Sequence, residues 1–206
     1  MFGDNIKVHF AGSEQIDFSM IASMAGVRYF LYTCFPFISE GFGIKGYPIT
    51  VKTLFPPKEI EKFSRHTIMD SGLFTLMFGA HAGKRDKPFM EAWQEAMIAF
   101  VLENDIKATI VELDCQKVLG VDEAWYFRKQ MRDRLPNHRH INVFHYEDGK
   151  DGFDRLIEFS DYIAISVPEL RIVKPKTYKD DVYQLASYAK NRKPTIDIHL
   201  LGCTEP

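Results

Sequence analysis

The stretch FMEAWQEAMIAFVLENDIKATIVELD, residues 89–114, places a helical pattern directly before a strand pattern. In its first part Trp93, Met97 and Val101 recur every four residues, a spacing that puts them on one face of a helix. Its second part, residues 107–114, is a short β-branched and apolar run of the kind that forms a buried strand. A helix followed at once by such a run is one piece of a repeated βα unit.

The same alternation extends along the chain in both directions. Strand–helix alternation is typical of an α/β fold with a parallel sheet, and the apolar helix faces are expected to pack on that sheet. Seven strands are predicted, at Ile6–Phe10, Val27–Cys34, His66–Asp70, Lys107–Asp114, Ile141–Tyr146, Tyr162–Ser166 and Thr195–Leu201.

Seven such units fit either an open doubly wound sheet or a (β/α)8 TIM-type barrel. A barrel must close, because an open edge leaves backbone hydrogen-bonding groups unpaired. We therefore expect a barrel that lacks its last βα unit in these 206 residues, as one C-terminally incomplete domain over residues 1–206. Two stretches, 35–57 and 73–88, are expected to be loops because glycine and proline interrupt them.

The composition is that of an ordinary globular protein, with 46% apolar residues and a net charge of −2. The near-neutral charge excludes a global argument for a nucleic-acid or membrane partner. Cys34, Cys115 and Cys203 are too widely spaced for a disulfide framework or a CxxC metal site, so a reducing, cytoplasmic location is expected. No signal peptide and no run of 18 apolar residues is present.

Polar residues follow the predicted strands, where parallel α/β folds bind their ligands. Asp70 ends the run HTIMD before a Ser-Gly turn, and Asp114 ends ATIVELD. Each carboxylate is open to two interpretations, an Asx-turn or helix cap and a pocket acid. Two carboxylates at the same edge of a sheet could together accept hydrogen bonds from a purine-like base. The further strand-end residues are Ser13, Glu14, Ser71, Gln116, His145, Glu147, Ser166, Glu169, Gly202 and Thr204.

Several catalytic motifs are absent from the sequence. It contains no GxxxxGK[ST], no GxSxG and no HExxH, which argues against P-loop enzymes, α/β-hydrolases and zincins. The histidines show no ligand spacing apart from His138 and His140, so no metal site is predicted within the chain.

The segment 171–193 holds seven basic and two acidic residues, a charge of +5, so the remainder of the chain sums to −7. A solvated helix face explains such a segment, and contact with phosphates is the alternative, which the interleaved tyrosines favour. The residues predicted to contact a nucleic-acid backbone are Arg171, Lys174, Lys176, Lys190, Arg192 and Lys193.

The run MDSGLF, Met69–Phe74, resembles the DSGGF motif of the tRNA-guanine transglycosylase (queuine/archaeosine) family. Three later segments resemble family segments in the same order. These are VELDCQ (Val111–Gln116), like the strand that ends in a base-recognising aspartate, DYIAISVPE (Asp161–Glu169), like AIGGL, and HLLGCTEP (His199–Pro206), like YLMGVGTPED. The short connections are most similar to the phage and bacterial members that act on DNA.

The resemblance implies a (β/α)8 pentosyltransferase that exchanges guanine in a polynucleotide for a 7-deazaguanine. It implies that Asp70 is the catalytic acid/base group and that Asp114 accepts hydrogen bonds from the guanine edge. Phe74 would stack on one face of the base, Leu201 would cover the other, and His145 would stand in the place of a base-contacting glutamine. The full base-binding set is Ser71, Phe74, Asp114, Gln116, His145, Ser166, Leu201 and Gly202.

The sequence departs from the family pattern at three places. Leu73 replaces the second glycine of DSGGF, Ser166 begins an SVP in place of GGL, and Gln116 stands where a cysteine is frequent. The family places its aspartate nucleophile, and often a zinc site of three cysteines and a histidine, after the segment that ends here at Pro206. Activity is therefore expected only with that nucleophile segment downstream, and zinc only with a downstream Cys/His cluster.

The leading hypothesis is a guanine transglycosylase that acts on DNA, or alternatively on tRNA, with a 7-deazaguanine such as preQ0 as incoming base. Base exchange needs a nucleophile at C1′, an acid/base group and extrusion of the target nucleotide into a pocket. The alternatives are a non-catalytic nucleic-acid-binding or accessory subunit, and a small-molecule TIM-barrel enzyme. The sequence leaves a homodimer open, and no membrane partner is expected.

Overall fold

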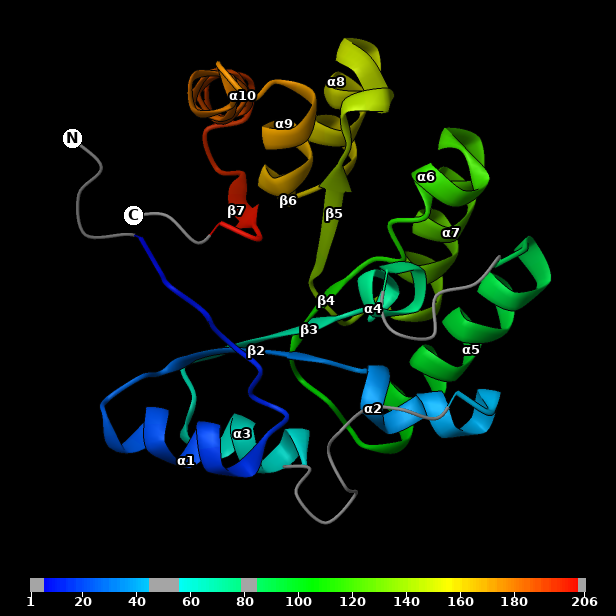
Figure 1. The fold of residues 1–206 in the computed structure, drawn as a ribbon, viewed down its shortest axis with the longest axis vertical. Helices are drawn as coiled ribbons and strands as arrows, with labels where there is room; N and C mark the ends of the chain where they lie inside the picture. Colours follow the sequence, from blue (N-terminus) through cyan, green and yellow to red (C-terminus); the bar gives the residue numbers. More distant parts are fainter. Residues whose placement is uncertain (1–5, 45–55, 79–84, 204–206) are drawn as a thin grey trace.

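Seven parallel strands form one curled sheet in a computed structural model that describes residues 6–44, 56–78 and 85–203. The strands follow one another in sequential order, so each pairs with its neighbours along the chain (Figure 1). Their bounds are β1 Phe10–Ala11, β2 Tyr29–Thr33, β3 His66–Asp70, β4 Thr109–Val111, β5 His140–Phe144, β6 Tyr162–Ser166 and β7 Asp197–Leu201. All seven predicted strands are confirmed within the described residues, in an α/β fold with a parallel sheet.

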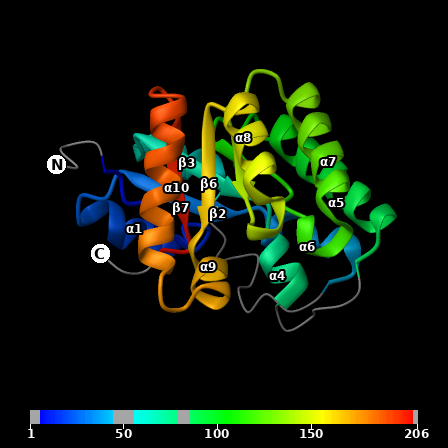
Figure 2. The same cartoon turned by 90° about the horizontal axis from the view of Figure 1, so that it is seen from above.

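Helices connect the strands and stand on the outer side of the curl, as Figure 2 shows for α5, α7, α8 and α10. The helix bounds are α1 Ile16–Met24, α2 Phe35–Ile38, α3 Pro57–Phe63, α4 Leu73–Phe78, α5 Lys87–Glu103, α6 Gln116–Leu119, α7 Val121–Arg134, α8 Gly149–Phe159, α9 Val167–Val173 and α10 Tyr178–Arg192. This arrangement is a half-barrel, in which one face of the sheet is covered by helices and the other is enclosed by the curl.

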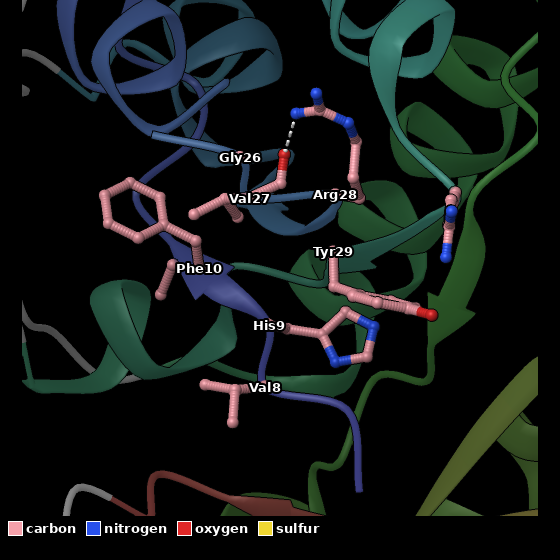
Figure 3. A pocket seen from close by; sticks show the side chains of 9 residues that line it. Val8, His9, Phe10, Gly26, Val27, Arg28 and Tyr29 are labelled. Atoms are coloured by element: carbon pink, nitrogen blue, oxygen red, sulfur yellow. Dashed lines mark hydrogen bonds between the residues drawn. The ribbon is translucent and has the colours of Figure 1, made fainter. Parts of the chain in front are cut away.

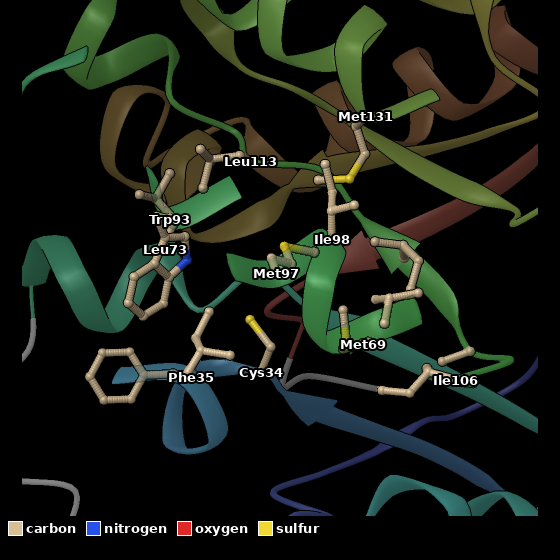
Figure 4. Close-up of a cluster of buried hydrophobic side chains, with 14 of the residues drawn as sticks. Cys34, Phe35, Met69, Leu73, Trp93, Met97, Ile98, Ile106, Leu113 and Met131 are labelled. Carbon is tan, nitrogen blue, oxygen red and sulfur yellow. The ribbon is translucent and has the colours of Figure 1, made fainter. Parts of the chain in front are cut away.

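Helix α5 shows how the sequence specifies these elements. Asp86 caps its first turn, accepting a hydrogen bond from the backbone N–H of Phe89 at 3.1 Å, and a proline stands in the same turn. Trp93, Met97 and Val101 are fully buried, as their spacing predicts. They belong to a large cluster of buried apolar side chains, which packs between the helices and strands β2, β3 and β4. Figure 4 shows part of this cluster.

A separate apolar cluster fills the concave side of the sheet. It consists of strand residues alone, namely Ile68, Val111, Ile141, Val143, Tyr162 and Ala164, with Leu31 and Leu201 against them. Successive side chains of a strand point to opposite faces, so the alternate residues of β3 and β5 that join this cluster face the inside of the curl. Asp70 belongs to the same face, two residues after Ile68.

Both stretches predicted to be loops contain helices, which corrects the sequence-based expectation. Residues 35–42 form α2 and the 3₁₀-helix η1 (Ser39–Phe42), and residues 73–78 form α4. Pro36 occupies the first turn of α2. Backbone N–H groups in the first turn have no partner within the helix, so the missing N–H of proline costs no hydrogen bond there and the helix is not broken. The remaining parts of these stretches, residues 45–55 and 79–84, lie outside the described residues.

The two edges of the sheet do not pair with one another within the described residues. β1 is two residues long and pairs only with β2, while β7 pairs only with β6. The sheet is therefore a curled half-barrel with an open side between β7 and β1.

Candidate active site at the carboxyl ends of the strands

The two predicted carboxylates lie at the same edge of the sheet. Asp70 is the last residue of β3, and Asp114 follows β4 by three positions, so parallel pairing of β3 with β4 brings them together. Burial raises the pKa of Asp70, and the negative charges of Asp114 and Glu14 raise it further, to about 6. The backbone N–H of Gly72 opposes this shift by donating to Asp70 Oδ1 at 2.8 Å.

His145 follows β5 and joins Asp114 to a third acid. Its Nε2 lies 3.2 Å from Asp114 Oδ2, and its Nδ1 lies 2.8 Å from Glu169 Oε2. Burial alone would lower the pKa of this imidazole, but the hydrogen bonds with the two carboxylates and their charges raise it to about 10. His145 is therefore an imidazolium at neutral pH that donates one N–H to each acid.

Lys117 holds the far side of Glu169. Its Nζ lies 2.6 Å from Glu169 Oε1 and 3.1 Å from Glu147 Oε2. Burial would lower the pKa of Lys117, yet the hydrogen bonds with the two glutamates raise it. The same contacts, together with His145, lower the pKa of Glu169 against the effect of its own burial. Asp114, His145, Glu169 and Lys117 thus form a continuous chain of charged hydrogen bonds.

The ligand atoms of His145, Glu147 and Glu169 all lie within 4.8 Å of one another, close enough to share a metal ion. A metal ion there would compete with the ammonium of Lys117, which already contacts both glutamates. The imidazolium of His145 and the ammonium of Lys117 balance the negative charges of Glu147 and Glu169, so this cluster needs no further cation for neutrality.

The Asx-turn interpretation of Asp70 is confirmed by its bond to Gly72. Ser71 is also engaged in the fold, since its carbonyl accepts hydrogen bonds from Trp93 Nε1 at 2.9 Å and from Cys34 Sγ at 3.2 Å. Its hydroxyl accepts from the backbone N–H of Leu73 at 3.4 Å, at the start of α4. The turn therefore fixes Asp70 rigidly, and the role of Ser71 in binding a base stays a prediction.

Three other predicted base-binding residues stand at the ends of β6 and β7. Leu201 is the last residue of β7 and packs against the concave apolar cluster. Ser166 ends β6 as a buried residue, and parallel pairing places it opposite Leu201. Gly202 has a positive φ of 65°, and a side chain there would meet Pro168 Cγ at 2.6 Å. These residues share the edge that carries Asp70 and Asp114.

Phe74 and Gln116 are placed differently. Phe74 lies on α4 with 73% of its surface exposed. Gln116 is buried at the start of α6, where its Nε2 donates to the carbonyl of Val143 at 3.1 Å and lies 3.5 Å from Asp148 Oδ2. Stacking by Phe74 and base contact by Gln116 stay predictions.

The basic segment is divided between the two ends of the sheet. Arg171 lies in α9, which begins directly after β6, and Lys174 and Lys176 follow in the connection to α10. These three residues are therefore near the edge that carries His145. Lys174 also lies over the ring of Tyr146, with Nζ 5.5 Å from its centroid.

The other three basic residues lie at the opposite end of α10, whose 15 residues span about 22 Å. They are bonded within the chain. Arg192 Nη2 lies 3.3 Å from Glu158 Oε1, Lys193 Nζ lies 2.6 Å from Asp161 Oδ1, and Lys190 Nζ lies 3.5 Å from the carbonyl of Pro194. Phosphate contact by all six predicted residues would thus need a polynucleotide that reaches both ends of α10.

Lys117 was not predicted from the sequence, and Glu169 was predicted only as a residue at a strand end. The position of Glu169, three residues after the end of β6, was the feature of the sequence that could indicate a role in the site. Lys117 stands three residues after Asp114, a spacing that carries no recognisable motif, and only the folded chain shows that it meets two glutamates.

No protein-family model, no curated protein and no solved structure matches this chain. Among the described residues no helix has the length and apolar character needed to cross a membrane. Assignment of a function therefore depends on the geometry of the site.

Proposed function

We propose that this chain carries the base-recognition and acid/base parts of a guanine transglycosylase, which exchanges guanine in a polynucleotide for a 7-deazaguanine. The observation that supports this most directly is the meeting of Asp70 and Asp114 at one edge of the sheet, with Asp114 bonded to a protonated His145. The resemblance of MDSGLF and VELDCQ to the transglycosylase motifs supports the same assignment.

In this proposal Asp114 reads the base. Guanine and 7-deazaguanines present an N1–H and an exocyclic amino group side by side, and a carboxylate can accept from both. The bond from His145 leaves Asp114 Oδ1 and further lone pairs of Oδ2 for this purpose, and it keeps the carboxylate in one orientation. Leu201 would cover one face of the base, and Phe74 the other.

Asp70 serves as the acid/base group. A carboxyl whose pKa is about 6 both gives and takes a proton readily near neutral pH, which an ordinary surface aspartate does not. When guanine leaves C1′ the purine ring gains electron density and needs a proton. Asp70 in its protonated form would supply that proton, and as a carboxylate it would take one back from the incoming base.

The finer fold assignment, a complete (β/α)8 barrel, is part of the same proposal. An eighth βα unit would pair with both β7 and β1 and would carry the nucleophile that attacks C1′. The apolar side chains that α1 exposes, among them Phe18, Ile21 and Met24, support a further helix against it, because such side chains gain stability when covered.

DNA, with tRNA as the alternative, is the proposed polynucleotide, held near the site by Arg171, Lys174 and Lys176. A cytoplasmic location belongs to this proposal as well. It is supported by the thiols of Cys34 and Cys115, both buried in the core.

Calorimetric titration of the 206-residue chain with guanine tests the proposal without the nucleophile. Guanine and preQ0 should bind and adenine should not, because adenine lacks the paired donors. Asp114→Asn should weaken guanine binding by about 10-fold or more, the usual effect of a lost charged hydrogen bond. Asp133→Asn, an exposed change on α7, is the matched control.

Equal affinity for guanine and adenine, or unchanged guanine affinity in Asp114→Asn, would overturn the assignment. Guanine binding without salt-sensitive binding of DNA or RNA would instead favour the small-molecule enzyme.

A further inference from the structure

Three histidines from distant parts of the chain meet at the amino-terminal side of the sheet. His9 directly precedes β1, His66 begins β3 and His199 lies in β7. The ring centroids of His9 and His66 are 5.0 Å apart, and those of His9 and His199 are 6.0 Å apart. His9 Nε2 and His66 Nδ1 face each other at 2.8 Å. The cluster therefore lies across the open side between β7 and β1.

Two of these rings are oriented by partners outside the cluster. The Nε2 of His66 lies 2.8 Å from the hydroxyl of Thr109, and His9 hydrogen-bonds to the backbone of Lys7. Histidines that bind metal ions characteristically use their second ring nitrogen in this way, because the outer bond fixes the tautomer and the ring orientation. In His66 the outer bond leaves Nδ1 directed at His9.

The spacing of His9 and His66 is close to that of two ligands of one metal ion. Zinc binds imidazole nitrogen at about 2.0–2.1 Å, so a tetrahedral ion separates two such nitrogens by about 3.3 Å and their ring centroids by about 5 Å. His9 and His66 would need to move apart by about 0.5 Å at their facing nitrogens to admit the ion. The nitrogens of the three rings do not all lie within 4.8 Å of one another, so the ring of His199 would need to turn and approach the other two by about 1.5 Å or more.

An ion could reach His9 from solvent, although His66 and His199 do not line the same cavity. His9 lines a cavity of about 680 Å³, together with Val8, Phe10, Arg28 and Tyr29, and Figure 3 shows its ring lying beside that of Tyr29. The cationic groups of Lys7 and Arg139 act on His66 and disfavour a cation, and Asp197, which pairs with Arg139 at 2.6 Å, offsets only part of this charge.

We propose that His9, His66 and His199 form a binding site for one divalent transition-metal ion, with zinc as the best fit to an all-imidazole set. Three histidines are a known zinc ligand set, and imidazole also suits cobalt, nickel and copper. The ion would link the segment before β1 to β3 and β7 through side chains, and so hold the two edges of the half-barrel at a fixed distance. This site is independent of the transglycosylase assignment and lies at the opposite end of the strands.

Titration of the chain with Co²⁺, followed by Zn²⁺, tests this site by visible absorption and calorimetry. One equivalent of Co²⁺ should give the intense visible bands of a tetrahedral ion, and Zn²⁺ should abolish them. His199→Ala and His9→Gln should each weaken binding by about 100-fold or more, since each removes one of three ligands. His140→Ala, a histidine outside the cluster that bonds the carbonyl of Leu135, should bind as the parent does.

A thermal melt gives a second readout. Zn²⁺ should raise the Tm of the parent chain and of His140→Ala, but not that of His9→Gln, whose side chain is only partly buried and should not impair folding. Loss of binding in Glu169→Gln with retention in His199→Ala and His9→Gln would place the ion at the carboxyl-end site and overturn the proposal. Absence of Co²⁺ binding by the parent chain would overturn it as well.

Discussion

His145 Nδ1 lies 2.8 Å from Oε2 of Glu169, and this contact joins the end of β5 to the first turn of α9. Both groups are buried, and each shifts the pKa of the other toward its charged form. The other nitrogen of His145 bonds Asp114, so the charge state of His145 determines how firmly Asp114 is oriented. Glu169 is in this sense a positioning residue for the proposed base-reading carboxylate.

Glu169→Gln should lower the pKa of His145 from about 10 toward its ordinary value near 6.5, because it removes one of the two carboxylates that favour the imidazolium. A raised histidine pKa stabilises the fold fully below pH 6.5, and the contribution is lost as pH rises through about 10. The variant should therefore be less stable than the parent below pH 6.5, and the difference should shrink as the pH rises toward 10.

Histidine ring signals in an NMR titration measure the pKa directly, and denaturation at pH 6 and pH 9 measures the stability. Glu147→Gln is the matched control, since Glu147 contacts Lys117 and not the imidazole. An unchanged titration of His145 in Glu169→Gln would contradict the account.

Asp70→Asn should stabilise the protein above pH 6. Because the folded pKa of Asp70 is raised to about 6, its favourable contribution exists below pH 4 and is lost as pH rises through 6. At pH 8 the charged form is held at a cost of roughly 1 to 3 kcal/mol, which asparagine removes while still accepting the bond from Gly72.

Thermal melts at pH 4 and pH 8 would show the effect as a gain in Tm at the higher pH alone. Asp133→Asn should show no such gain. A loss of stability in Asp70→Asn at pH 8 would mean that the carboxylate supports the fold, which would remove one argument for its catalytic role.

The buried ion pair between Arg128 and Glu112 is expected to be the most sensitive polar contact in the fold. Arg128 Nε and Nη2 each lie 2.6 Å from one carboxylate oxygen of Glu112, which also accepts from Asn142 and from the backbone N–H of Val143. Arg128→Met would leave a buried carboxylate without its counter-ion, so the free energy of unfolding should fall by about 3–5 kcal/mol.

Arg134→Met is the control, because Arg134 pairs with Glu95 at 2.7 Å on the exposed surface. Such a pair contributes at most about 1 kcal/mol. Urea denaturation of both variants measures the difference, and similar losses would show that the buried pair contributes no more than an exposed one.

The strands could be predicted from the sequence because each is a β-branched or apolar run between helical segments. The bounds of β3 and β6 are those predicted. β2, β4 and β7 are shorter than predicted because the apolar run continues past the paired residues, whereas β1 extends one residue beyond its predicted end and β5 begins one residue before its predicted start. The helices α2 and α4 were missed because four and six residues complete too few turns to show a period. The proline and glycine around α2 were taken as signs of a loop.

The site could be predicted only as a set of positions. Asp70 ends a strand, Asp114, His145 and Glu169 follow strands, and parallel strands end at one edge, so their proximity could be predicted. Which side chain bonds which depends on rotamers and on the connections after each strand. The contact of Lys117 with Glu169 and the meeting of His9 with His199 join residues distant in sequence, and no periodicity reports such pairs.

Gly72→Ala should destabilise the protein more than Gly12→Ala, although both glycines have a positive φ, of 75° and 83°. Each variant incurs a left-handed backbone cost of about 1–2 kcal/mol. A side chain at position 12 would meet nothing within 4 Å, whereas one at position 72 would lie 2.8 Å from Phe35 Cβ and 3.1 Å from Thr33 Oγ1. The Cβ of Phe35 is fixed to the backbone of α2 and cannot rotate away, so overpacking should lower the free energy of unfolding of Gly72→Ala by about 1–3 kcal/mol more.

The added methyl group in Gly72→Ala should also shift the turn after β3. Since the N–H of Gly72 donates to Asp70, the pKa of that carboxyl should change in the same variant. Urea denaturation of both variants at pH 7 measures the difference, and equal losses would mean that the turn relaxes without moving α2.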